Sequence, residues 1–147
     1  MKKNVTLYNV IFPFWMLYLF PVMWLIIIPS NFLIDSLVLI ISMFVLKIAD
    51  KKQFYKKHIL KIFALGMLSD IIGSATMFLA VWLEISTMAD EWYLLVPAII
   101  LSASAIFLFN YFFTFKKEDK NIRLKLSLIF AIITAPYTFF IPTSWIN

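Results

Sequence analysis

The stretch ILKIFALGMLSDIIGSATMFLAVWL, residues 59–83, decides the fold of this chain. A helix that crosses a membrane needs about 20 mainly apolar residues, and this stretch is long enough. Its charged residues are Lys61, near one end, and Asp70, near the middle. A segment of this length and composition predicts a transmembrane helix with one acidic side chain inside the bilayer.

The rest of the chain is also mainly apolar and poor in charged residues. Of its 147 residues, 63% are hydrophobic and 14% are charged, whereas soluble domains are about 45–50% apolar and about 25% charged. The polar stretches between apolar runs are too short for a separate soluble domain. We therefore predict a single all-α transmembrane domain over residues 1–147. Its five spans are expected at roughly 6–28, 31–49, 59–83, 93–115 and 124–143.

Four short connections separate these predicted spans. They are Pro29-Ser30, residues 50–58, residues 84–92 and residues 116–123. Segments joined by such short connections are expected to be antiparallel neighbours. In this interpretation the second helix begins near Asn31, directly after Ser30.

The distribution of charge predicts the orientation. All 13 Lys and Arg residues fall on one side of the five-span arrangement, whereas Glu84, Asp90 and Glu91 fall on the other. Positively charged residues flanking membrane spans stay in the cytoplasm. We therefore predict a cytoplasmic N-terminus and an external C-terminus. A composition rich in Lys, Ile, Phe and Asn is typical of an AT-rich genome, which favours a multi-pass protein of a bacterial cell membrane.

Two aspartates, Asp35 and Asp70, lie inside predicted spans. They are equally far from position 52.5, taken as the centre of the basic connection between the two spans, so an antiparallel hairpin would place both at one depth. An intramembrane carboxylate costs about 2.5–3.5 kcal/mol on insertion scales, which makes it a functional-site hypothesis by default. In the second predicted hairpin, Ser102 and Thr134 lie at a similar depth. We predict that these four side chains form a polar layer that binds a proton or a hard cation such as Na⁺.

Structural interpretations of both aspartates stay open. Asp35 follows the predicted helix start at Asn31, where the helix dipole favours a carboxylate. Asp70 can join two helices as a buried carboxyl that is hydrogen-bonded to Ser69, Ser102 or a tyrosine hydroxyl. Near the predicted layer, Pro136 has no backbone N–H, so the carbonyl of Ile132 loses its helical partner and becomes a further candidate ligand.

Gly66 and Gly73 are the two glycines of the chain. They lie four residues before and three residues after Asp70, so all three residues share one helix face. Small residues allow close approach of a second helix in a membrane. We predict that this face packs against a neighbouring helix and that Asp70 points toward that helix or a cavity.

Several functions lack the residues that they need. With no cysteine and one histidine, His58, the chain cannot build a zinc or thiolate site, so we expect no metal centre and no cofactor. No nucleotide-binding, zinc-protease or serine-hydrolase motif occurs. The net charge of +5 implies no nucleic acid, because lysines beside spans follow from the cytoplasmic preference of positive charge. We expect these lysines to attract anionic lipid headgroups, and His58 to lie among them at the interface.

The sequence is compatible with three hypotheses about function. The first is a small transporter or channel-like protein with an intramembrane proton or cation site, and five helices without a repeat would then act as a homo-oligomer. The second is a non-catalytic membrane subunit that assembles, anchors or regulates a larger complex through a partner membrane protein. The third, a membrane enzyme acting on lipid, has the least support, because the basic residues lie on the side opposite to Asp35.

Overall fold

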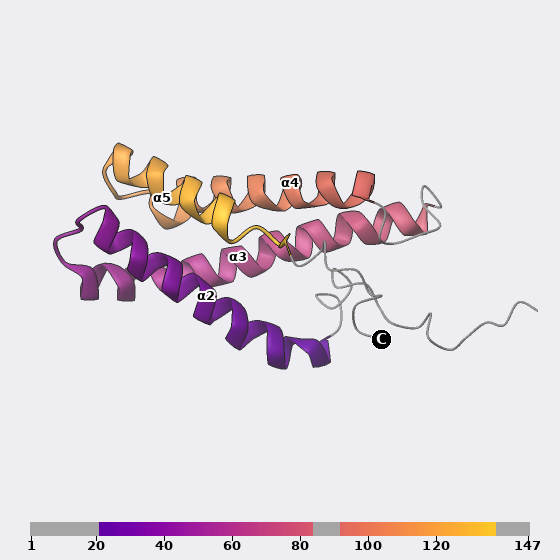
Figure 1. Ribbon diagram of the computed structural model, residues 1–147, viewed down its shortest axis with the longest axis horizontal. Coiled ribbons are helices and arrows are strands. Elements are labelled where there is room, and N and C mark those ends of the chain that lie inside the picture. Colours follow the sequence, from indigo (N-terminus) through magenta and orange to yellow (C-terminus); the bar gives the residue numbers. More distant parts are fainter. Residues whose placement is uncertain (1–20, 84–91, 138–147) are drawn as a thin grey trace, which may run out of the picture.

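The computed structural model describes residues 21–83 and 92–137, and their regular structure is helical throughout (Figure 1). The all-α fold class is therefore confirmed for this part of the chain. Segments Pro21–Val45, Lys51–Ala80 and Leu95–Thr114 are long and apolar enough to cross a membrane. The α-helices are α2 (Trp24–Val45), α3 (Lys51–Trp82), α4 (Trp92–Phe109) and α5 (Lys120–Ile133). A 3₁₀ turn, η2 (Pro21–Met23), precedes α2, and a π-helical segment, η3 (Asn110–Thr114), extends α4.

Two helical hairpins make up the described bundle. One consists of α2 and α3, and the other of α4, η3 and α5; their tight turns lie at the same end of the molecule (Figure 1). Helix α3 packs against both α2 and α4, and α5 packs against α4 and also contacts α2. Away from the turns, α2 diverges from α3 (Figure 1). This divergence, together with the early end of α5, positions the site described below.

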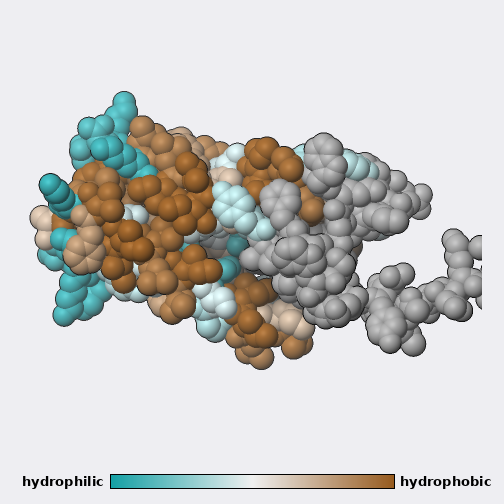
Figure 2. Space-filling model, in the orientation of Figure 1, coloured by the Kyte–Doolittle hydropathy of each residue, from teal (hydrophilic) through white to brown (hydrophobic). Residues whose placement is uncertain are grey.

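The surface is apolar over most of its length. Figure 2 shows a broad hydrophobic band, with hydrophilic residues gathered at the end that carries the two turns. Large side chains such as Leu25, Ile26 and Phe44 are more than 60% exposed. Water would disfavour such a surface, whereas lipid covers it without cost.

The core lies near the turn end of the bundle. Its fully buried side chains come from both hairpins and include Leu39, Ile62, Phe115, Leu126 and Phe130. The Phe115 ring contacts the rings of Phe54 and Phe130, so it packs one hairpin against the other. This packing fixes the relative position of the helices that carry the polar residues.

The predicted connection at Pro29-Ser30 is wrong. Helix α2 continues through both residues from Trp24 to Val45. Pro29 removes one backbone hydrogen bond, but a helix in lipid must satisfy its polar groups internally, so unwinding the chain there would expose more of them. The Ser30 hydroxyl instead donates to the Ile26 carbonyl at 2.8 Å. The predicted boundary between spans 6–28 and 31–49 is therefore replaced by one continuous helix.

The fifth predicted span is also corrected within the described residues. Helix α5 ends at Ile133 rather than continuing to residue 143, because Pro136 disfavours helical geometry at the residue before it. Residues 138–143 of this span, most of the span 6–28 and most of the connection 84–92 lie outside the described residues. The count of five spans is thus not established by the structure.

The two basic connections are shorter than predicted. Helix α3 begins at Lys51 and α5 at Lys120, whereas connections were expected over 50–58 and 116–123. Lys47, in the left-handed region at φ 53°, terminates α2 in the manner of a helix C-cap. At the start of α3 the backbone N–H of Gln53 donates to the Asp50 carboxylate at 3.4 Å. The residues of α2 and α3 that lie opposite each other therefore differ from those expected for a nine-residue connection over 50–58.

Candidate intramembrane ion site

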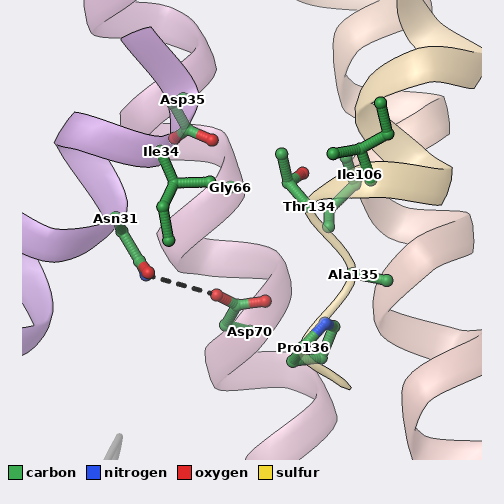
Figure 3. A pocket seen from close by; sticks show the side chains of 10 residues that line it. Asn31, Ile34, Asp35, Gly66, Asp70, Ile106, Thr134, Ala135 and Pro136 are labelled. Atoms are coloured by element: carbon green, nitrogen blue, oxygen red, sulfur yellow. Dashed lines mark hydrogen bonds between the residues drawn. The ribbon is translucent and has the colours of Figure 1, made fainter. Parts of the chain in front are cut away.

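A cavity of about 90 Å³ lies between α2, α3, α4 and the end of α5 (Figure 3). One water needs only about 10–15 Å³ of such space, so the cavity can hold an ion or several water molecules. Its walls combine acidic, amide and hydroxyl side chains with apolar ones. They are Asn31, Ile34 and Asp35 of α2, Gly66 and Asp70 of α3, Ile106 of α4, and Ile133, Thr134, Ala135 and Pro136 at the end of α5.

Asp70 is held by side chains from both neighbouring helices. Ser102 of α4 donates a hydrogen bond to its Oδ1 at 3.2 Å, and Asn31 of α2 donates to its Oδ2 at 3.4 Å. The same Asn31 nitrogen lies 3.1 Å from the sulfur of Met67. Asp70 is only 5% exposed. It therefore joins three helices and carries hydrogen bonds that a buried carboxyl requires.

Asp35 has a different environment. It is 6% exposed and lines the cavity, yet within residues 21–83 and 92–137 no hydrogen bond or ion pair to its carboxyl is found. Figure 3 shows its carboxyl directed toward the cavity and Thr134. A buried carboxyl without a protein partner is costly, so it is a candidate for binding something other than the protein.

Gly66 of α3 lies directly opposite Asp35 of α2. A Cβ atom at position 66 would lie 3.6 Å from Asp35 Oδ2, an ordinary van der Waals contact. A larger side chain there would extend into the cavity that both residues line. Gly66 and Asp70 both face this space, one turn apart on α3, whereas Gly73 is buried but does not line the cavity.

The two aspartates do not lie at one level. Asn31, rather than Asp35, is opposite Asp70, and Asp35 is opposite Gly66. Because Asn31 precedes Asp35 by four residues, the carboxyls are offset by about one helical turn, or about 6 Å. The expected common depth is therefore wrong, since α3 begins at Lys51 and the connection that sets the register is shorter than predicted.

Thr134 lies beyond the last turn of α5 and lines the cavity opposite Asp35 (Figure 3). Its hydroxyl donates to the Phe130 carbonyl at 2.6 Å, so the oxygen lone pairs stay available to a ligand. The Ile132 carbonyl, predicted to be left free by Pro136, accepts a hydrogen bond from the Tyr137 hydroxyl. That carbonyl is thus not a free ligand.

The structure brings together all four predicted polar residues. Asp35, Asp70 and Thr134 line one cavity, and Ser102 bonds to Asp70. Sequence reasoning missed Asn31, which it assigned to a helix start. The signal was its spacing of four residues from Asp35, which places the two on one face once the helix is continuous through Pro29.

A second polar contact joins the hairpins near their turns. The Glu118 carboxylate lies 3.0 Å from Lys57 Nζ and 3.0 Å from His58 Nε2. Burial of Glu118 favours its neutral form, but hydrogen bonds from Lys57 and His58, together with the Lys57 charge, outweigh this and lower the pKa of the carboxyl below its usual value. His58 is 1% exposed, so it lies inside the protein near the turns, and its expected position at the membrane interface stays a prediction.

The cavity chemistry is that of oxygen ligands. Across residues 21–83 and 92–137, no three His, Cys, Asp or Glu side chains lie close enough to hold a metal ion together. Two carboxyls, one amide and one hydroxyl instead suit a proton or a weakly bound hard cation. No family model, curated protein or solved structure matches this chain. The functional proposal therefore rests on the geometry of the cavity.

Proposed function

We propose that this protein is a small membrane transporter or channel-like protein that binds a proton or a hard monovalent cation at Asp35. The observation that carries the proposal is the Asp35 carboxyl. It is buried on a helix that is long and apolar enough to cross a membrane, and it lines a cavity without a partner among residues 21–83 and 92–137. Intramembrane carboxyls of this kind typically mark ion and proton paths.

The two aspartates have different roles in this proposal. Asp70 receives hydrogen bonds from Asn31 and Ser102, so it holds helices together and orients the wall of the cavity. Asp35 supplies the charge that binds the ion. The Thr134 hydroxyl and the Asn31 amide oxygen complete an oxygen-rich site on the same cavity.

We propose that the lysine-bearing connections between α2 and α3 and between η3 and α5 face the cytoplasm of a cell, as the positive-inside rule requires. Anionic headgroups would then contact Lys52, Lys56, Lys116 and Lys117, which are exposed. A cytoplasmic N-terminus, an external C-terminus and assembly as a homo-oligomer remain parts of this proposal.

Ion flux into proteoliposomes tests the assignment. Wild-type protein should carry H⁺ or Na⁺ down an imposed gradient, and Asp35→Asn should reduce the flux at least ten-fold without loss of folded protein. Asp119→Asn is the matched control, because Asp119 is exposed and makes no capping hydrogen bond. Comparison of a pH-sensitive dye with ²²Na⁺ uptake distinguishes the proton from the cation.

Equal flux through wild type and Asp35→Asn would contradict the proposal. An absence of flux from folded wild-type protein would contradict it as well. The second reading, a non-catalytic subunit, would then be the better account of an apolar bundle with short connections.

A further inference from the structure

Four buried polar atoms in the turn half of the bundle lack hydrogen-bond partners among the residues that the structure describes. They are His58 Nδ1, Asn110 Oδ1, Thr114 Oγ1 and Ser127 Oγ, from α3, η3 and α5. None of these residues is more than 3% exposed. A buried polar group without a partner is costly, and bound water usually supplies the missing hydrogen bond.

The four residues are linked to Phe115 through ring contacts, a backbone hydrogen bond and chain adjacency. The His58 ring lies 5.1 Å from that of Phe115, and Phe115 donates its backbone N–H to the Asn110 carbonyl. Thr114 directly precedes Phe115 in the chain. Ser127 lies one turn before Phe130, whose ring contacts Phe115 at 6.3 Å. Contacts between η3 and both α3 and α5 complete this arrangement.

This cluster lies between the ion cavity and the turn end of the molecule. Asn110 is one turn beyond Ile106, which lines the cavity, and Ser127 is two turns before Thr134. At the helical rise these steps are about 6 Å and about 10 Å. Buried apolar side chains, including Leu39, Ile62 and Phe130, lie at intermediate positions along the helices.

The π-helical form of η3 accounts for two of the four groups. An α-helix that ends in a π-helical turn changes the direction of its side chains, and such turns are frequent at functional sites. Here both Asn110 and Thr114 are buried. On the turn side of the cluster, His58 contacts Glu118, which is partly exposed and also paired with Lys57. Polar groups thus extend from the surface to the cluster.

We propose that His58, Asn110, Thr114 and Ser127 form a hydrated polar layer that connects the cytoplasmic end of the protein with the Asp35 cavity. The ligand of this layer is water, together with the proton or cation that crosses it, so its role in transport rests on the proposed function. The apolar side chains between the layer and the cavity form the constriction that an ion must pass, as hydrophobic constrictions do in channels.

Cysteine labelling tests the layer. The chain has no cysteine, so each single-cysteine variant carries one thiol. The charged reagent MTSET reacts with thiolates, which form where water is present. Applied to the cytoplasmic side of inverted vesicles, it should modify Ser127→Cys at least ten-fold faster than Leu128→Cys. Leu128 is the matched control, because it is adjacent in α5 and exposed on the apolar surface.

A second pair of cysteine variants keeps the test valid if a variant of the first pair does not fold. Thr114→Cys should react at least ten-fold faster than Phe113→Cys, whose position is exposed in the same π-helical segment. Gel filtration and a thermal melt check that every variant is folded. Rates that are equal within both pairs would overturn the proposal.

Flux measurements separate this proposal from that of the Asp35 site. Thr114→Val combined with Ser127→Ala should lower the Asp35-dependent flux several-fold, and an unchanged flux would remove the layer from the path. Fast labelling together with flux that does not depend on Asp35 would overturn the Asp35 site while supporting hydration of the layer. Ion flux that depends on Asp35, together with equal labelling rates within both cysteine pairs, would overturn the hydrated layer but not the Asp35 site.

Discussion

At the scale of single residues, the two aspartates differ in their surroundings, and our proposal assigns packing to Asp70 and ion binding to Asp35. Asp70 accepts hydrogen bonds from two neighbouring helices, whereas Asp35 faces a cavity beside Gly66. The sequence supports the presence of both carboxyls inside the membrane but does not distinguish them. The distinction depends on which residues of other helices lie opposite, and sequence spacing within one helix does not determine that.

Ser102→Ala should destabilise the bundle. The change removes a donor to the buried Asp70 carboxyl, and interhelical hydrogen bonds in membranes contribute about 0.6 kcal/mol on average and at most about 1.7. Unfolding in mixed micelles with increasing SDS measures the free energy. Ser104→Ala is the control, because Ser104 is exposed and bonds only to the Ile100 carbonyl of its own helix. An equal effect of both changes would contradict the assigned role of Asp70.

Gly66→Leu should abolish ion flux while Gly66→Ala is folded and partly active. The alanine Cβ reaches only van der Waals contact with Asp35, whereas a leucine side chain would fill the cavity. Ala64→Leu, at an exposed position of the same helix, controls for added bulk. Full flux through folded Gly66→Leu would show that the cavity is not on the path.

At the scale of the elements, periodicity and length predict helices well but place their ends poorly. The segment 93–115 corresponds closely to α4 with η3, whereas α3 begins at Lys51, well before the predicted segment 59–83. Pro29-Ser30 was misplaced as a connection because proline and serine favour turns in soluble proteins, whereas lipid favours an unbroken helix. Because a connection was predicted at Pro29-Ser30, Asn31 was assigned to a helix start and not to the wall of the cavity. The same prediction contributed to the wrong depth for Asp35.

Pro29→Ala should raise the thermal stability of the protein. Alanine restores the backbone N–H that a continuous α2 lacks, and an interior proline costs up to about 3 kcal/mol in a soluble helix. Pro21→Ala, at the beginning of the helical segment, should change stability little, since a proline there removes no helical hydrogen bond. A decrease for Pro29→Ala would indicate that a turn conformation is required at this position.

At the scale of the whole molecule, the packing of two hairpins places both basic turns at one end of the described bundle. The positive-inside signal is readable from the sequence. The hairpin register, the cavity and the buried position of His58 are not, because each depends on contacts between residues more than thirty positions apart, such as Asn31 with Asp70.

Acidification should weaken the contact between the hairpins. Because the folded-state pKa of Glu118 is lowered, its ion pairs stabilise the protein above the unfolded pKa of about 4.5 and are lost as pH falls through the folded value. Thermal melts between pH 7 and pH 3 should therefore show a larger decrease in Tm for wild type than for Glu118→Gln. Parallel decreases would mean that Glu118 contributes no net stabilisation.

Single cysteines should report the orientation of the turns. In intact cells, Ala49→Cys and Lys117→Cys, both at exposed positions, should resist a membrane-impermeant maleimide and react after permeabilisation. Cysteines appended to the two chain ends test the proposed cytoplasmic N-terminus and external C-terminus. Labelling of both turns in intact cells would reverse the orientation.

Infrared difference spectroscopy of the reconstituted protein tests most directly whether Asp35 binds the ion. Exchange of Na⁺ for K⁺, or a pH step, should change a carboxyl band in wild type and in Asp119→Asn, and this change should be absent from folded Asp35→Asn. An identical difference spectrum for wild type and Asp35→Asn would contradict the assignment of Asp35 as the binding group.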